Sequence, residues 1–462
     1  MEQTTAKKNK YEIDMCNGTI MDKLISFSLP LMLSGILQLM FNAVDIIVVG
    51  RFSGSQALAA VGSTSALINV FTNLFIGISL GANVLMARFY AAGREKEVSE
   101  TVHTAITLAL VSGIVMALVG LVFSKGALAL MGTPDDVIGL SALYMRIYFL
   151  GMPFFMLYNY GAAILRAVGD TKRPLLFLMI AGVINACLNM VLVIVFKLGV
   201  AGVAIATVIS QMISCVLVLR CLCRSESSYR LRFSELGMKG YYLKQIFSVG
   251  VPAGIQSTVI NFSNVLLQSS VNSFGSTAMA GYTAANNLLG FLYVSVNSIT
   301  QACMSFTSQN YGVGKLKRMD RVLADCMILS VVVAVVLGCI CYGFGPEILQ
   351  IYTEDAEVIA CGMEILAYTT ITYFLCGWMD LFPGALRGMG YSAVPMVLSV
   401  IGTVGTRVVW IFGIFPYHRS LAILFISYPA SWIITIILQV VCFYFVRRRV
   451  HRRSQTPAGQ EG

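Results

Sequence analysis

A single aspartate stands inside an apolar stretch near the start of the chain. Residues 41–51 read FNAVDIIVVGR, and Asp45 has no basic residue after it until Arg51. An ionised carboxylate in membrane hydrocarbon costs about 2.5–3.5 kcal/mol on insertion scales, so such residues usually mark a binding or transport function. The carboxyl group is neutral when protonated and anionic when not. It can therefore hold either a proton or a second cation, Na⁺ or an organic cation, but not both at once. We predict a cation-exchange role for Asp45; the alternative is a structural aspartate permanently bonded to hydroxyls and amides.

Two later apolar stretches carry amide and hydroxyl side chains that could serve the same site. In VINACLNMV, residues 183–191, Asn185 and Asn189 are four residues apart and therefore share one face of a helix. Thr207 lies in the next apolar stretch, within AIATVIS. These three side chains offer neutral oxygens and N–H groups, which can complement one carboxylate.

The helix that carries Asp45 holds two further residues of interest. Pro30 lies fifteen residues before Asp45, and proline removes a backbone hydrogen bond and kinks a helix. Gln38 lies seven residues before Asp45, two turns away on nearly the same face. We expect Gln38, together with Asn159, to line a substrate cavity. A static kink at Pro30 is the alternative to a bending one.

Membrane-spanning helices must position these residues. Of the 462 residues, 57% are apolar and only 12% are charged, against about 25% charged residues in soluble domains. A spanning helix needs about 20 apolar residues, and the sequence predicts twelve: 24–50, 57–87, 101–123, 140–165, 175–196, 198–220, 244–273, 280–308, 322–345, 358–386, 394–415 and 421–446. The expected fold is therefore an all-α polytopic membrane protein.

Basic residues fall mainly on one side of this predicted topology. With the N-terminus in the cytoplasm, 26 of the 32 Lys and Arg residues lie on the cytoplasmic side and 4 on the opposite side. This bias follows the positive-inside rule and predicts that both termini are cytoplasmic. The net charge of +10 is thus explained by topology, and no nucleic-acid partner is expected. The polar first 23 residues predict no cleavable signal peptide.

Enzymatic and metal chemistry receive little support from the sequence. Most of the twelve cysteines fall in apolar runs, where Cys acts as a small hydrophobe. No P-loop or HExxH motif is present. We therefore expect no cofactor, no metal beyond a possible Na⁺ at Asp45, and no obligatory protein partner.

The chain contains an internal duplication at an offset of 221–222 residues. Residues 165–174 read LRAVGDTKRP, and residues 386–395 read LRGMGYSAVP. Earlier in each half, Pro30 of the first half corresponds to Pro252 of the second. Each half holds six predicted spans, so both halves enter the membrane the same way up and are expected to form two six-helix bundles related by a pseudo-twofold axis along the membrane normal. The predicted segments are a tail at 1–23, an N-lobe at 24–220, a cytoplasmic linker at 221–243, a C-lobe at 244–446 and a basic tail at 447–462.

Four stretches of the chain resemble one transporter family. They are VDIIVVGRFSGSQALAAVG at 44–62, ILRAVGDTKRP at 164–174, GVAGVAIATVIS at 199–210 and ALRGMGYSAVP at 385–395. On these residues the chain resembles bacterial members of the multidrug and toxic compound extrusion (MATE) family, over essentially all of 20–446. The resemblance implies a secondary active transporter of a bacterial cytoplasmic membrane. It would export cationic or amphipathic drugs or metabolites by alternating access, in exchange for H⁺ or Na⁺.

The resemblance also implies roles for individual residues. Asp45, Asn185, Asn189 and Thr207 would form the N-lobe cation site, and bending at Pro30 would change the N-lobe cavity. Many family members carry an aspartate where this chain has Asn189, so Na⁺ would find only one anionic ligand here. This departure favours a single-carboxylate H⁺ switch. Some members also carry a glutamate in the seventh helix, where this chain reads VINFSN, which weakens the case for a C-lobe cation site.

Two further charged residues lie inside predicted spans of the second half. Asp380 is seven residues before Arg387, about 10 Å from the cytoplasmic end of its span at 1.5 Å per residue. Arg407 is twelve residues after Pro395, about 18 Å into the next span. Because unpaired charges are rarely tolerated at such depth, we predict a structural ion pair between Asp380 and Arg407.

Three other functions remain as alternatives. A flippase for lipid-linked oligosaccharides or cell-wall precursors would need several arginines in its cavity to hold a diphosphate, whereas only Arg146 and Arg407 lie within predicted spans. An intramembrane enzyme would need a cluster of nucleophile and base, which the sequence does not present. A channel would need a ring of charged or carbonyl groups rather than a solitary carboxylate.

Overall fold

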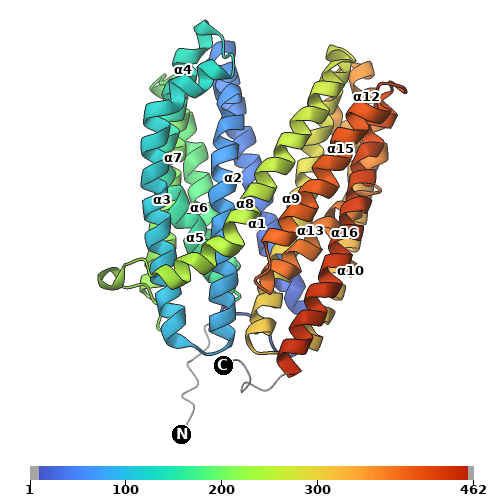
Figure 1. Ribbon diagram of the computed structural model, residues 1–462. Helices are drawn as coiled ribbons and strands as arrows, with labels where there is room; N and C mark the ends of the chain where they lie inside the picture. Colours follow the sequence, from blue (N-terminus) through green and yellow to red (C-terminus); the bar gives the residue numbers. More distant parts are fainter. Residues whose placement is uncertain (1–9, 456–462) are drawn as a thin grey trace. The chain divides into compact units, whose positions relative to one another are not determined.

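A computed structural model describes residues 10–455 of the protein, and all regular secondary structure in this range is helical (Figure 1). Its spans run in order as α1 Met21–Phe52, α2 Ser55–Ala91, α3 Glu95–Leu130, the pair α4 Asp135–Leu150 and α5 Met152–Ala167, α6 Lys172–Asn189 with the π-helix Met190–Val195, α7 Gly199–Cys223, α8 Gly240–Asn272, α9 Ser276–Gly312, α10 Leu316–Gly343, the pair α12 Ala356–Thr369 and α13 Tyr373–Gly388, the broken span Ala393–Ile414, and α16 Leu421–Gln455. A short helix α11, Gly345–Gln350, leads from α10 to α12.

The lengths and polarity of these helices account for the twelve predicted spans. Eight spans are long and apolar enough to cross a membrane by themselves, and the pairs α4–α5 and α12–α13, bent by 47° and 50°, add one span each. The remaining two are α8 and α9, which are 33 and 37 residues long but carry more polar side chains. The predicted all-α polytopic fold is confirmed.

The helices form two compact units whose boundaries differ from the predicted lobes. Among the described residues, unit 1 contains 10–13 and Leu33–Gly254, and unit 2 contains Asp14–Met32 and 255–455. The chain thus changes unit within α1 and again within α8, although both helices are continuous. Each change comes two residues after a proline of the internal repeat, Pro30 in α1 and Pro252 in α8.

Glycines explain why the first part of α8 belongs to unit 1. A Cβ at Gly77 would lie 2.3 Å from the Cα of Gly254, and one at Gly81 would lie 2.1 Å from the carbonyl oxygen of Ile246. Without hydrophobic drive between helices in lipid, small residues permit the close backbone approach that holds helices together. Helices α2 and α8 therefore pack backbone to backbone at these glycines.

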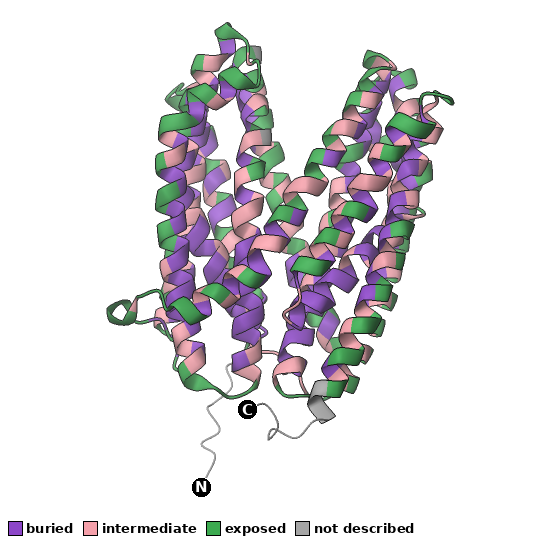
Figure 2. Cartoon of the chain, viewed as in Figure 1, coloured by how far each residue is buried: buried purple, intermediate pink, exposed green. Residues whose placement is uncertain are grey.

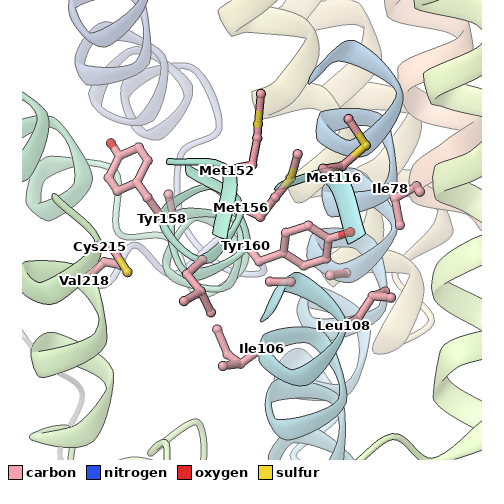
Figure 3. Close-up of a cluster of buried hydrophobic side chains, with 14 of the residues drawn as sticks. Ile78, Ile106, Leu108, Met116, Met152, Met156, Tyr158, Tyr160, Cys215 and Val218 are labelled. Atoms are coloured by element: carbon pink, nitrogen blue, oxygen red, sulfur yellow. The ribbon is translucent and has the colours of Figure 1, made fainter. Parts of the chain in front are cut away.

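Each unit has its own buried core. Within each unit, buried residues follow the inward faces of the helices and exposed apolar residues the outward faces (Figure 2). In unit 1, Met152, Met156 and Tyr160 of α5 are fully buried and lie beside Met116 of α3 (Figure 3). Unit 2 has a separate cluster that includes Tyr282, Phe425 and Trp432.

The segment predicted as a linker is packed against unit 1. Helix α7 ends at Cys223 and α8 begins at Gly240, with one 3₁₀ turn, Phe233–Glu235, between them. Tyr229 is fully buried, and its hydroxyl donates to Glu12 at 2.7 Å. The backbone N–H of Arg232 donates to His103 at 3.1 Å. The connection is therefore ordered by specific contacts, although its sequence is polar.

Candidate functional site

Asp45 lies at the centre of a polar cluster in unit 1. It belongs to α1, and only 9% of its surface is exposed. One carboxylate oxygen accepts a hydrogen bond from the amide nitrogen of Asn189, and the other faces the hydroxyl of Thr207 at 3.5 Å. The structure therefore brings together residues from α1, α6 and α7 that the sequence separates by up to 162 positions.

The amides of α6 form a short chain of hydrogen bonds behind the carboxylate. Besides its bond to Asp45, the side-chain nitrogen of Asn189 donates to the side-chain oxygen of Asn185, Oδ1, at 3.1 Å. The side-chain oxygen of Asn189 is buried without a hydrogen-bond partner. Thr207 donates to the Val203 carbonyl at 2.9 Å, a shorter contact than the one to Asp45. Asn189 is thus the principal donor to the carboxylate.

Local helix geometry explains how these residues meet. A Cβ at Gly182 of α6 would collide with the ring of Phe41 of α1. The missing side chain therefore lets α1 approach α6 about one turn away from Asp45 and Asn185. Asn189 is the last residue of α6, and the π-helix Met190–Val195 begins directly after it. A π-helical segment changes the direction of the following side chains and is frequent at functional sites.

The carboxylate of Asp45 has no basic counter-charge. Among residues 10–455, no Lys, Arg or His forms an ion pair with it, and its hydrogen-bond donors are neutral. A buried anion with neutral donors alone is costly in a low-dielectric environment, whereas its protonated form is not. The cluster can therefore favour uptake of a proton or binding of a cation.

Two tyrosines near this cluster were missed by the sequence analysis. Tyr144 and Tyr148 of α4 are close enough to Asp45 to interact with it electrostatically. Their rings are tilted against each other with centroids 6.1 Å apart. The spacing of four residues in the segment LYMRIYF could have indicated a shared helix face. Nothing in the sequence pairs that face with α1.

The predicted cavity residues are not joined to the polar cluster by hydrogen bonds. Gln38 is exposed on α1, and the half-buried Asn159 donates to the Phe155 carbonyl of its own helix at 2.8 Å. Pro30 is buried inside α1, two residues before the chain passes from unit 2 to unit 1. A substrate-lining role for Gln38 and Asn159 stays a prediction.

The expected ion pair between Asp380 and Arg407 is not formed, so this prediction is wrong. Arg407 donates through one terminal nitrogen, Nη1, to the hydroxyl of Ser263 at 2.8 Å and to the amide oxygen of Asn264 at 2.7 Å. Asp380 interacts electrostatically with Arg387 instead, seven residues further along α13. Residues seven apart lie on nearly the same helix face, which explains why the cation of its own helix replaces the expected one.

Comparisons with known proteins agree over nearly the whole chain. The MatE family profile matches residues 30–191 and 252–412. The probable multidrug resistance protein YoeA of Bacillus subtilis (strain 168) is 32% identical over 92% of this chain and 93% of its own length. The multidrug export protein MepA of Staphylococcus aureus (strain NCTC 8325 / PS 47) is 22% identical over 82% of this chain and 84% of its own.

A solved structure shows the same fold. The outward-facing conformation of a multidrug resistance MATE family transporter of the MOP superfamily superimposes with a TM-score of 0.87 at 19% identity, covering 98% of this chain and 100% of that chain. The shared fold is that of a multi-pass, all-helical membrane protein with twelve spans in two lobes, and the family match makes the chain a transporter and not an enzyme. The chain belongs to the MATE family.

Proposed function

We propose that this transporter exports cationic or amphipathic drugs or metabolites by alternating access, and that Asp45 couples export to the entry of H⁺. One observation carries the proposal: the buried Asp45 carboxylate is held by neutral donors alone, without a basic partner among the described residues. The names of the relatives YoeA and MepA, which refer to multidrug resistance and multidrug export, support the choice of drugs as substrates.

The chemistry of exchange follows from the two states of one carboxyl group. When Asp45 is ionised, the cluster carries one negative charge and attracts an organic cation. When a proton binds, the charge disappears and the cation loses its partner, so the two cannot be held together. Differential affinity of this kind is what allows one ligand to shift the population of a transporter's states. Proton entry is thereby linked to release of the drug.

The surroundings of Asp45 favour H⁺ over Na⁺ as the coupling ion. Na⁺ prefers several oxygen ligands, but the side-chain oxygen of Asn185 already accepts from the Asn189 N–H, and Asn189 turns an N–H rather than its oxygen toward Asp45. An aspartate in place of Asn189 would supply a second anionic ligand. With one carboxylate, proton exchange requires no further group.

Bending of α1 at Pro30 would transmit the change at Asp45. The chain passes between the two units two residues after Pro30, so α1 contributes to both units. A proline lacks the N–H that would otherwise join its turn to the preceding one, which makes that turn a suitable hinge. We further propose that the protein lies in a bacterial cytoplasmic membrane with both termini in the cytoplasm, in agreement with the distribution of basic residues.

The test is drug-driven exchange in proteoliposomes, with ethidium as the organic cation. Wild type, Asp45→Asn and Glu364→Gln are compared under an imposed pH gradient and under an imposed Na⁺ gradient. Glu364 is an exposed acid of α12 and serves as the matched acid-to-amide control. We expect ethidium transport with the pH gradient in wild type and Glu364→Gln, and its loss in Asp45→Asn. Normal coupling in Asp45→Asn would make Asp45 structural; transport driven by the Na⁺ gradient alone would replace H⁺ by Na⁺.

A further inference from the structure

Unit 2 contains a buried cation that lacks a counter-charge. Arg407, in the short helix α15, Thr406–Val409, is 3% exposed. Among residues 10–455, no aspartate or glutamate forms an ion pair or a side-chain hydrogen bond with it. A buried guanidinium is expensive unless it is paired, so its environment calls for an anion that the described chain does not supply.

The neutral partners of Arg407 use only one side of its guanidinium. Both side-chain hydrogen bonds, to Ser263 and Asn264, leave from Nη1. The Nε–H is buried and has no acceptor. Arg407 thus has an unused donor on the edge formed by Nε and Nη2, and a guanidinium edge of this kind binds a carboxylate through two parallel hydrogen bonds.

Aromatic side chains form the remaining walls around this guanidinium. Its central carbon lies 4.6 Å from the ring centroid of Tyr428, a cation–π contact that contributes about 0.5–2 kcal/mol. The hydroxyls of Tyr428 and Tyr282 are 3.2 Å apart. Their shared hydrogen bond uses one of the two hydroxyl protons and leaves the other able to donate. The ring of Tyr282 is also stacked on Phe425, with centroids 6.1 Å apart.

The position of this group in the repeat indicates a ligand site rather than an isolated packing feature. The offset of 221–222 residues takes Thr207 to Tyr428 and takes Asn185 to within one residue of Arg407. The residues that hold Arg407 also come from α8, the repeat partner of α1. Unit 2 therefore places a buried charge without an ionic partner where unit 1 has its polar cluster, with the opposite sign.

We propose that this cluster in unit 2, formed by Arg407, Ser263, Asn264, Tyr282 and Tyr428, binds the carboxylate of an amphipathic organic anion such as an aromatic acid. One positive charge matches a monoanion, whereas a phosphate dianion would leave excess negative charge in a buried place. The aromatic rings suit an apolar body next to the carboxylate. Asn264 and Tyr428 are only half-buried, so the cluster can be reached from their side. This proposal goes beyond cation exchange at Asp45 and does not depend on it.

The test is equilibrium binding of benzoate to the purified full chain by isothermal titration calorimetry. Benzamide has the same shape without the charge and is the matched probe, and chloride tests whether any small anion suffices. The variants are Arg407→Gln, Arg407→Lys and Arg419→Gln; Arg419 is an exposed arginine of the same unit and serves as the control. Thermal unfolding of each variant shows that it is folded.

We expect wild type and Arg419→Gln to bind benzoate saturably and to discriminate against benzamide and chloride. Arg407→Gln should weaken benzoate binding by about 10- to 100-fold, because it removes a charge-assisted contact made by two hydrogen bonds. Arg407→Lys keeps the charge but not the paired donors, so its effect should be intermediate. Undiminished binding in folded Arg407→Gln would overturn the proposal. If Arg407→Gln does not fold, the measurements on wild type decide. The proposal is overturned if wild type binds benzamide or chloride as tightly as benzoate, or if it does not bind benzoate.

Discussion

The two units of this transporter are related by the internal repeat, and they differ in the sign of the buried charge that lacks an ionic partner among the described residues. In unit 1 this charge is Asp45 on α1, and amide and hydroxyl donors surround it. In unit 2 the internal repeat puts Leu266 or Leu267 at the place of Asp45. The charge there is Arg407, on the repeat partner of the span that carries Asn185 and Asn189, with a hydroxyl and an amide oxygen as acceptors.

This difference teaches that duplication preserved the positions of polar side chains more closely than their chemistry. The cluster in unit 1 joins three spans and the cluster in unit 2 joins four. Both lie beside π-helical segments, Met190–Val195 in unit 1 and Trp410–Ile414 in unit 2. The scaffold is set by helix packing, which tolerates either sign. A buried anion with neutral donors attracts protons and cations, and a buried cation with neutral acceptors attracts anions. The two halves are therefore expected to recognise different ligands.

The largest expected effect comes from moving the carboxylate within unit 1. Asp45→Asn should lose pH-driven ethidium export by about 5- to 150-fold, the range of a typical coupling free energy. The double variant Asp45→Asn/Asn189→Asp exchanges the two partners of the Asn189–Asp45 hydrogen bond, so that the carboxylate lies at position 189 instead of 45. This variant should regain part of the pH-driven export. The measurement is initial rate in proteoliposomes under an imposed pH gradient. If the double variant is as inactive as Asp45→Asn, the position and not only the charge is essential.

The two repeat-related prolines provide the next comparison. Pro30→Ala and Pro252→Ala each restore a backbone N–H inside a long helix, a change that can stabilise the straight helix by up to about 3 kcal/mol. Because Pro30 lies in the helix that carries Asp45, we expect slower pH-driven export for Pro30→Ala and near-normal export for Pro252→Ala. Equal effects on the same transport rates would show that both units bend during transport.

A smaller effect, on stability, is expected for the buried arginines of unit 2. A buried ion carries a desolvation penalty of several kcal/mol, and its replacement by an apolar residue of similar volume relieves that penalty without leaving an opposite charge unpaired. Arg407→Met should therefore keep or raise the thermal unfolding temperature of the purified protein. Arg387→Met should lower it, because Arg387 interacts with Asp380 and donates to Gln256 at 2.6 Å. The reverse order would mean that Arg407 has an ionic partner after all.

The smallest effect is expected for a carboxylate outside the membrane spans. The hydrogen bond from Arg232 lowers the pKa of Glu235 from its ordinary value of 4.5. A lowered folded-state pKa means that this contact stabilises the protein above the unfolded pKa and is lost as the pH falls through the lowered value. Glu235 is exposed, so Glu235→Gln should leave unfolding and the pH dependence of export at neutral pH unchanged. A shifted pH profile of export in this variant would remove Asp45 as the sole pH-sensitive group.

Much of the architecture follows from local patterns in the sequence. Runs of about 20 apolar residues predict the twelve spans, and the repeat of LRAVGDTKRP as LRGMGYSAVP indicates the duplication. Asp45 stands out because a charge in such a run is rare. The partners Asn189 and Thr207 were expected from the family resemblance and helix-face spacing, and the structure places both at the carboxylate.

Partner choice could not be predicted in the same way. Depth along a span suggested that Asp380 would meet Arg407, yet Arg407 contacts α8 and Tyr428 because helix rotation and π-helical turns decide where a side chain points. The same holds for Tyr144 and Tyr148, whose spacing is visible but whose neighbour is not. The unit boundaries differ from the predicted lobes for a related reason: α1 and α8 each contribute residues to both units, and no composition change marks the position where the chain passes from one unit to the other.

The sequence by itself determined that this protein spans a membrane twelve times, that it is built from two related halves, and that the first half buries a carboxylate. These properties depend on hydrophobicity, periodicity and the cost of a charge in lipid, which are local in the chain. The tertiary structure alone decided that Asn189, rather than Thr207, is the principal donor to Asp45, and that no carboxylate of the described residues pairs with Arg407. Those outcomes depend on the rotation and close approach of helices, such as α1 against Gly182 of α6, which no short stretch of sequence encodes.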